Sequence, residues 1–158
     1  MEPDVAIRAA TAEDAAQLAE LKLLWSPPDV EPKDCERAMF AHDLRSWIEA
    51  APDARICMVA AIGEQLVGMA WLVVFERAPD YDARRRLTGD VQSVFVRPEH
   101  RGRGIAGELV RALLGAADDR GVLRVTVSAN VEAAPVYLRA GFRDAPMLLE
   151  RRRERPIG

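Results

Sequence analysis

The sequence predicts a mixed α/β fold, in which helices flank one central sheet. Segments rich in β-branched and aromatic residues alternate along the chain with longer segments of helical periodicity. Only Gly63 and Glu64 separate two of the strand-like segments, a spacing typical of a β-hairpin. The 158 residues, 49% of them hydrophobic and 30% charged, suit a single globular domain over residues 1–158 with its own core.

The first half of the chain is predicted to contain two helices between strands. In order, we expect a strand over 5–10, a helix over 12–24, a loop over 26–32, a helix over 34–50 and hairpin strands over 55–62 and 65–75. Thr11 is expected to cap the first helix, with Asp14 as its capping-box partner three residues on.

The second half continues with a polar connection over 76–89 and strands that alternate with helices. We expect a strand over 90–96, a helix from the following glycines to about 120, a strand over 122–129, a helix over 133–140 and a last strand over 147–152. Gly141 is expected to end the short helix. Strand alternation predicts that Asp90, Gln92, Val94 and Val96 share one face of their strand, while Ser93 and Phe95 face the other way.

The composition argues against several classes of protein. No apolar run approaches the roughly 20 residues of a membrane span, and the start lacks the basic and apolar regions of a secretory signal. Cys35 and Cys57 are therefore expected to be reduced in a cytoplasmic protein without membrane contacts. With only His42 and His100 beside them, no metal site is expected.

The charge is unevenly distributed along the chain. Residues 1–79 carry 7 Lys/Arg and 14 Asp/Glu, whereas residues 80–158 carry 15 and 11. One interpretation is ordinary solvated surface; the other is a basic half that holds a polyanion and an acidic half that faces a cation. The arginine runs at 84–86 and 151–153 are short and have acidic neighbours, so no nucleic-acid partner is expected.

The stretch from Ser93 to Leu114 passes from a strand through closely spaced glycines into a helix. At such a helix start the unpaired N–H groups and the helix dipole favour an anion, and glycines let phosphate oxygens approach the backbone. Arg101 and Arg103 add positive charge beside Gly102 and Gly104. A simple strand-to-helix turn is the alternative. A dinucleotide motif fits the spacing through Gly107, but it stands late in the chain rather than in a first β-turn-α unit.

The same stretch resembles a known family. "RGRGIA" at 101–106 fits the Q/R-x-x-G-x-G/A signature of the GNAT family of N-acetyltransferases, and "VSANVEAAPVYLRAGF" at 127–142 is similar to the family's strand, Asn, short helix, Tyr and Gly-Phe. The specific resemblance covers about residues 88–144. It implies a single-domain GNAT-like fold with a mostly antiparallel sheet whose fourth and fifth strands splay apart.

The resemblance also implies acetyl-CoA as co-substrate. Its pyrophosphate would be held by the backbone amides of Arg101, Gly102, Arg103, Gly104, Ile105 and Ala106. Its pantetheine amides would meet the backbone of Val94 and Val96. Asn130 is expected to cap the following helix and to touch the cofactor.

Acetyl transfer to an amine requires an acceptor for the amine proton and a donor for the departing thiolate. By resemblance, Tyr137 is the acid. Asp90 is the first candidate for the base, through a water, with Glu36, His42 and Glu76 as alternatives. A structural role for either residue is the competing interpretation.

The expected function is therefore transfer of an acetyl group from acetyl-CoA to a primary amine of a small molecule or peptide. By resemblance, the acceptor site involves residues 25–36 and 76–88. A CoA-binding sensor without turnover and a nucleotide-binding oxidoreductase domain are the two alternatives. A homodimer stays open.

Overall fold

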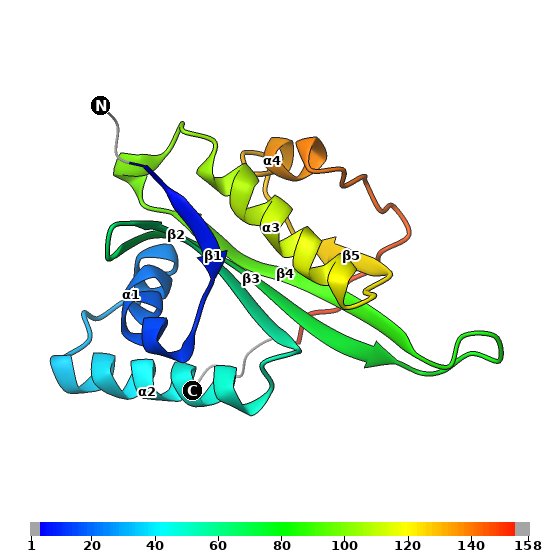
Figure 1. Cartoon of the computed structure of the whole chain (residues 1–158), viewed down its shortest axis with the longest axis horizontal. Helices are drawn as coiled ribbons and strands as arrows, with labels where there is room; N and C mark the ends of the chain where they lie inside the picture. Colours follow the sequence, from blue (N-terminus) through cyan, green and yellow to red (C-terminus); the bar gives the residue numbers. More distant parts are fainter. Residues whose placement is uncertain (1–3, 154–158) are drawn as a thin grey trace.

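The computed structural model of the chain describes residues 4–153. Its elements, coloured along the chain in Figure 1, are β1 (Ala6–Ala9), η1 (Ala12–Asp14), α1 (Ala15–Trp25), α2 (Asp34–Ala50), β2 (Arg55–Ile62), β3 (Gln65–Arg77), β4 (Arg86–Val96), η2 (Pro98–His100), α3 (Ile105–Asp119), β5 (Arg124–Val127) and α4 (Ala134–Arg139). The predicted helix over 34–50 and strand over 55–62 are confirmed with these bounds. None of the helices in this described part of the chain has the length and apolarity to cross a membrane.

The strands form one sheet in the order β1-β2-β3-β4-β5. Neighbouring strands run antiparallel except β4 and β5, which are parallel and joined through α3. A parallel pair needs a crossover connection, and α3 supplies it. The predicted mixed, mostly antiparallel sheet flanked by helices is thereby confirmed.

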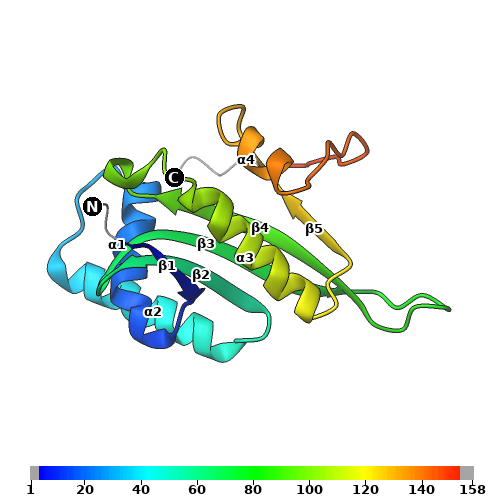
Figure 2. The same ribbon diagram turned by 45° about the horizontal axis from the view of Figure 1, so that its top comes forward.

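Helices cover both faces of the sheet (Figures 1 and 2). One core lies under α3 and α4 and includes Leu72, Val91, Leu109 and Leu113. The other lies under α1 and α2 and includes Leu18, Leu44 and Trp71. Because both faces of β2 and β3 are buried, these strands consist of nearly continuous apolar sequence.

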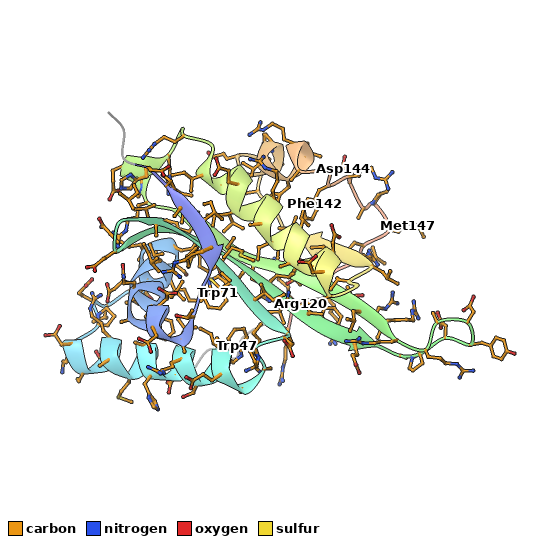
Figure 3. The ribbon with its side chains drawn as sticks, in the orientation of Figure 1. Trp47, Trp71, Arg120, Phe142, Asp144 and Met147 are labelled. Atoms are coloured by element: carbon orange, nitrogen blue, oxygen red, sulfur yellow. The ribbon has the colours of Figure 1, made fainter. Side chains whose placement is uncertain are left out.

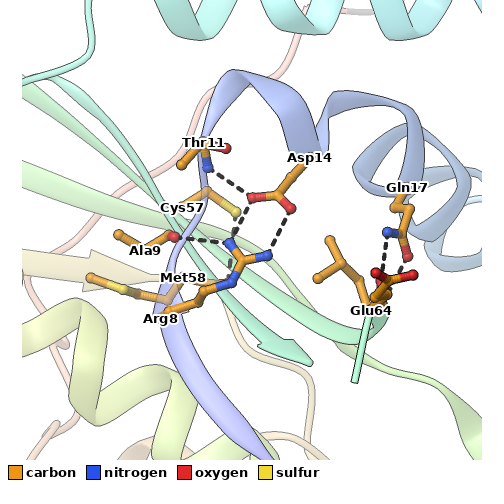
Figure 4. A network of polar contacts seen from close by, with 9 residues as sticks. Arg8, Ala9, Thr11, Asp14, Gln17, Cys57, Met58 and Glu64 are labelled. Carbon is orange, nitrogen blue, oxygen red and sulfur yellow. Dashed lines mark hydrogen bonds and ion pairs between the residues drawn. The ribbon is translucent and has the colours of Figure 1, made fainter. Parts of the chain in front are cut away.

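A small polar network fixes the crossing from β1 into η1 (Figure 4). Arg8 donates from both terminal nitrogens to the carboxylate of Asp14, at 2.7 and 2.8 Å. The same carboxylate accepts the backbone N–H of Thr11 at 2.8 Å, as the predicted capping box requires. The helix after Thr11 begins with one 3-10 turn before α1.

Strand β4 begins four residues earlier than predicted. It pairs with β3 from Arg86, opposite Arg77, so the connection comprises 78–85 rather than 76–89. Gly89, taken as part of that connection, lies inside the strand. A Cβ there would come 2.8 Å from the Leu72 side chain, so glycine is required by close packing rather than by a turn.

The predicted alternation of side chains along β4 is wrong beyond Ser93. Ser93 has a φ of +46°, and the register with β3 shifts between Met69 and Trp71, which places a bulge in β4. Before the bulge, Gln92 pairs with Trp71 on the α1/α2 face. After it, Val94 and Val96 pack into the core under α3.

The bulge therefore separates residues that were expected to lie together. Asp90 pairs with Val73, two residues from Trp71 on the same strand, so it shares the α1/α2 face with Gln92. It does not share a face with Val94 and Val96.

The sheet opens at its far edge, as the resemblance implied. β5 pairs with β4 only from Thr88 to Val91, so the rest of β4 runs on past its last β5 partner. β5 is also shorter than the predicted strand over 122–129.

The predicted last strand over 147–152 is wrong, since these residues form no strand. Met147 lies on the outside of the molecule, 93% exposed (Figure 3), and Leu149 is 92% exposed. An apolar run becomes a strand only where a sheet edge and a buried face receive it, and here neither does.

Candidate active site

Gly102 and Gly104 shape the entry into α3. Both have left-handed backbone conformations, with φ values of +77° and +78°. A Cβ on either residue would meet no protein atom within 4 Å. These glycines are therefore required by backbone conformation, and the space beside them is open to a ligand.

At the third glycine, Gly107, the absence of a side chain has a different reason. It lies in the first turn of α3, and a Cβ there would come 3.3 Å from the guanidinium of Arg111, one helical turn further on. Glycine thus lets the Arg111 side chain lie against the helix. Both residues line the pocket described next.

An open pocket of about 750 Å³ extends from this glycine loop along β4 to α4. Nine of the predicted site residues line it: Val94, Val96, Arg101, Gly102, Gly104, Ile105, Ala106, Asn130 and Tyr137. Two predicted residues, Asp90 and Arg103, do not. Trp25, expected on the acceptor side, lines it as well.

Arg101 and Arg103 are held by neighbours at the loop. The Arg101 Nε donates to the Val96 carbonyl at 3.0 Å, and its guanidinium lies 5.6 Å from the centre of the Phe95 ring. Arg103 lies with a terminal nitrogen 3.5 Å from His100 Nδ1. Both side chains place positive charge at the start of α3, although the Nε of Arg101 is already hydrogen-bonded to the backbone of β4.

Tyr137 projects from α4 and is buried, with its ring edge-to-face against Phe142 at 5.5 Å between centroids. Burial raises the pKa of the phenol above its ordinary value, so the hydroxyl stays protonated at neutral pH. Asn130 accepts the Ala133 N–H at 2.8 Å, which agrees with its predicted role at the start of this helix.

Asp90 lies outside this pocket, on the α1/α2 face of the sheet. Its carboxylate accepts hydrogen bonds from Thr126 Oγ1 and Gln92 Nε2, both at 3.2 Å. Two residues of strand, Val91 and Gln92, separate it from Ser93, so that the two Cα atoms are about 10 Å apart. Any action of Asp90 near the bulge would therefore need a relay of waters.

Several functional candidates were not predicted from the sequence. Three are basic side chains that line the pocket: His100, Arg111 and Arg139. Arg111 could have been found from its position four residues after Gly107, on the same helix face.

Lys22 is a further candidate, at the bulge itself. Its ammonium donates to Ser93 Oγ at 3.2 Å and lies 5.2 Å from the centre of the Trp71 ring. No sequence signal indicated this contact, because the bulge that brings Ser93 to α1 was not predicted.

A second hollow, of about 360 Å³, lies at the far end of β3 and β4. Phe75, Glu76, Arg85 and Arg120 are among its lining residues. Arg120 donates there to the Asp53 carbonyl at 3.2 Å. Glu76, one of the alternative candidates for the base, lines this hollow, whereas Tyr137, Asp90 and the predicted cofactor-binding residues do not.

Comparison with known proteins agrees with this fold. The sequence model of the acetyltransferase (GNAT) family matches residues 18–142, most of the chain. The chain therefore belongs to the GNAT family, and it is an N-acetyltransferase of that family by this relationship. No curated protein matches it by sequence.

Solved structures show the same fold at low sequence identity. An acetyltransferase of Clostridium acetobutylicum, solved with acetyl-CoA, has a TM-score of 0.74 and 22% identity over 94% of this chain and 96% of that one. Glucosamine-6-phosphate N-acetyltransferase of Arabidopsis thaliana has 0.77 and 14%, over 96% and 99%. Ribosomal-protein-alanine N-acetyltransferase of Brucella melitensis has 0.70 and 22%, over 96% and 99%.

Proposed function

We propose that this chain transfers the acetyl group of acetyl-CoA to a primary amine of a small molecule or peptide. One observation carries the proposal. A single pocket of about 750 Å³ joins the left-handed glycine loop, the free stretch of β4 and the Tyr137 phenol. This order of features along the pocket suits a long ligand that has an anionic group at one end and a reactive group at the other.

The residues at the loop fit a diphosphate. Gly102 and Gly104 leave open space where side chains would stand, and the N–H groups of the first turn of α3 have no partner within the helix. Arg111 and Arg139 add cationic groups to the pocket wall. The backbone of Val94 and Val96, past the last β5 partner, is our candidate for the pantetheine amides.

Tyr137 is our candidate for the general acid. Bound acetyl-CoA supplies an activated acetyl group whose leaving group is a thiolate, with an ordinary thiol pKa of about 8.5. Because burial keeps the Tyr137 phenol protonated, its hydroxyl can donate to the sulfur as negative charge develops there.

Asp90 is our candidate for the base. A free alkylamine has a pKa of about 10 and is mostly protonated at neutral pH, so the site must remove a proton before attack. Asp90 faces the same side of the sheet as Trp71, on the α1/α2 face. From there its carboxylate would receive the proton through a relay of waters.

The acceptor is an amine in this proposal because the family is one of N-acetyltransferases. The neighbours named after glucosamine-6-phosphate and ribosomal-protein alanine modify a sugar phosphate and a protein, respectively. Their names support both small molecules and peptides as acceptors.

Release of free thiol tests the proposal. The protein is incubated with acetyl-CoA and a panel of amino acids, amino sugars, polyamines and peptides, and binding of acetyl-CoA is measured by calorimetry. We expect micromolar to submillimolar binding and thiol release with at least one amine. Acetyl-CoA binding without release for any amine would favour the non-catalytic sensor.

A further inference from the structure

A cation without a carboxylate partner stands at the bulge of β4. Lys22 projects from α1, and its ammonium contacts Ser93 Oγ and the rings of Trp71 and Trp25, the latter at 5.7 Å. No carboxylate within residues 4–153 forms an ion pair with it. The ammonium has three N–H donors. Within residues 4–153, only one of them has a protein hydrogen-bond acceptor, which is the Ser93 hydroxyl.

Burial makes this cation unusual. Desolvation lowers the pKa of Lys22 below its ordinary value, and only the nearby Cys57 thiol opposes the effect. A half-buried ammonium without a counter-ion is costly, and an anion placed beside it would recover that cost. The two indole rings supply part of the compensation through cation–π contacts.

The position of Lys22 relates it to the acceptor. Val94 and Val96, our candidates for the cofactor path, follow the bulge and face α3, whereas Ser93 directs its hydroxyl towards α1. Lys22 therefore lies across the strand from the cofactor path, at the point where that path reaches the bulge. Trp25, which contacts Lys22, also lines the pocket.

Two acidic residues near α1 already have a basic partner. Arg37 forms ion pairs with both Glu20 and Glu31. Glu31 lies within residues 25–36, which the resemblance assigns to the acceptor site. The charged group that contacts the bulge directly is the ammonium of Lys22.

We propose that the acceptor amine carries a carboxylate, as amino acids do, and that Lys22 binds this carboxylate beside Trp71 while the amine faces the bulge. The inference rests on the proposed function, since it names the acceptor class of that same site. Lys22 is a specificity residue in this proposal. It forms and breaks no bond.

Selective labelling tests the contact directly, because the chain has only two lysines, Lys22 and Lys33. Protein with ¹³C-labelled lysine gives two Cε signals, and an exchange to Met at either position assigns them. The CoA-saturated protein is titrated with the twenty amino acids in small groups, and then with the same amino acids as carboxamides.

We expect the Lys22 signal to move with at least one group of free acids and not with the matching carboxamides, while the Lys33 signal stays in place. No movement with any free acid, or equal movement with the carboxamides, would overturn the proposal. This readout does not depend on turnover. Failure of the proposed function would instead be seen as absent acetyl-CoA binding or absent thiol release.

Activity supplies the second arm. Wild type should release thiol at least about tenfold faster with a free amino acid than with its carboxamide, since a hydrogen-bonded charge contact contributes about 1.5–3 kcal/mol. Lys22→Met keeps the apolar stem over Trp71 and should lose this preference, with unchanged acetyl-CoA affinity. Lys33→Met, at the exposed start of α2, should keep it. A preference that survives Lys22→Met would contradict the proposal.

Discussion

Gly104 precedes α3 with a φ of +78° and open space beside its Cα. In Gly104→Ala the methyl group would stand where we place a phosphate, and the left-handed backbone would be strained by about 1–2 kcal/mol. We expect the Kd for acetyl-CoA to rise about tenfold or more, equivalent to about 1.4 kcal/mol, when calorimetry is run on folded protein.

Gly115 provides the matched control for that change. It lies in the same helix, has no left-handed φ and has open space for a Cβ. Gly115→Ala should leave acetyl-CoA affinity unchanged and stabilise the protein by up to about 1 kcal/mol. Equal affinity of Gly104→Ala and wild type would remove the glycine loop from the binding site.

Tyr137 offers a test of the proposed acid. Tyr137→Phe keeps the edge-to-face packing on Phe142 and removes only the hydroxyl. We expect unchanged acetyl-CoA affinity and a kcat lower by about 10²–10⁴-fold, the usual range for general acid–base catalysis. Steady-state kinetics with one identified amine measures the change in kcat. An unchanged kcat would exclude a rate-limiting role for the phenol.

Asp90 is tested by the shape of a pH–rate profile. In Asp90→Asn, kcat/KM should fall most at neutral pH and recover in part at alkaline pH, where more of the amine arrives deprotonated. Thr126→Val removes one hydrogen bond to the carboxylate but not the carboxylate itself, so its loss should be smaller. Profiles of wild type and Asp90→Asn that run parallel would assign Asp90 a structural role.

At the residue scale, the motif located Gly102 and Gly104 between a strand and a helix, where the structure has them. Their left-handed backbone was not predicted and is a finding of the structure. The face of Asp90 could not be predicted, because alternation assumes an unbroken strand and nothing about Ser93 marks a bulge. The contact between Ser93 and Lys22 escaped prediction for the same reason.

At the scale of elements, the pair Arg8–Asp14 ties the end of β1 to the start of the first helix (Figure 4). Hydrogen bonds from Arg8 hold the pKa of Asp14 below its ordinary value, against the effect of burial. The stabilisation is therefore complete above the pKa of an unfolded aspartate, about 4. It is lost as the pH falls through the lower folded value.

Asp14→Asn should lower the free energy of unfolding at pH 7 by about 1 kcal/mol, a modest value because the Arg8 side chain is 45% exposed. Below about pH 4 the difference from wild type should shrink. Urea denaturation at pH 7 and pH 3 measures both. Asp43→Asn, on the exposed side of α2, is the control and should change neither. A difference that is the same at both pH values would contradict the charged role of Asp14.

Elements with their own apolar period were predictable, whereas elements that depend on a partner were not. Helix α2 and strand β2 carry their periodicity in sequence and were predicted with the observed bounds. Strand β4 was predicted too short because its first residues are polar and gain strand structure from pairing with β3. The segment over 147–152 has strand-like composition and no strand to pair with.

At the scale of the whole molecule, the pocket is assembled from parts far apart in the chain. The glycine loop comes from the start of α3, the free backbone from the end of β4 and the phenol from α4. Figure 2 shows the positions of these three elements. Apart from the last strand, the order of strands and helices could be predicted from sequence, and the position of the motif within it indicated the proposed cofactor side. The proposed acceptor side could not be predicted, because the bulge and the approach of α1 are tertiary features.

This assembly predicts that acetyl-CoA stabilises the protein as a whole. A ligand that binds only the folded state contributes about 2.7 kcal/mol at a concentration of 100 Kd. For a chain of this size we expect the Tm to rise by about 5–10 °C. Thermal unfolding with acetyl-CoA, free CoA and NAD measures it. Both forms of CoA should raise the Tm, and the rise should be smaller in Gly104→Ala because its loop binds them more weakly. NAD should leave the Tm unchanged. A rise with NAD alone would instead favour the oxidoreductase alternative and overturn the assignment of this pocket to CoA.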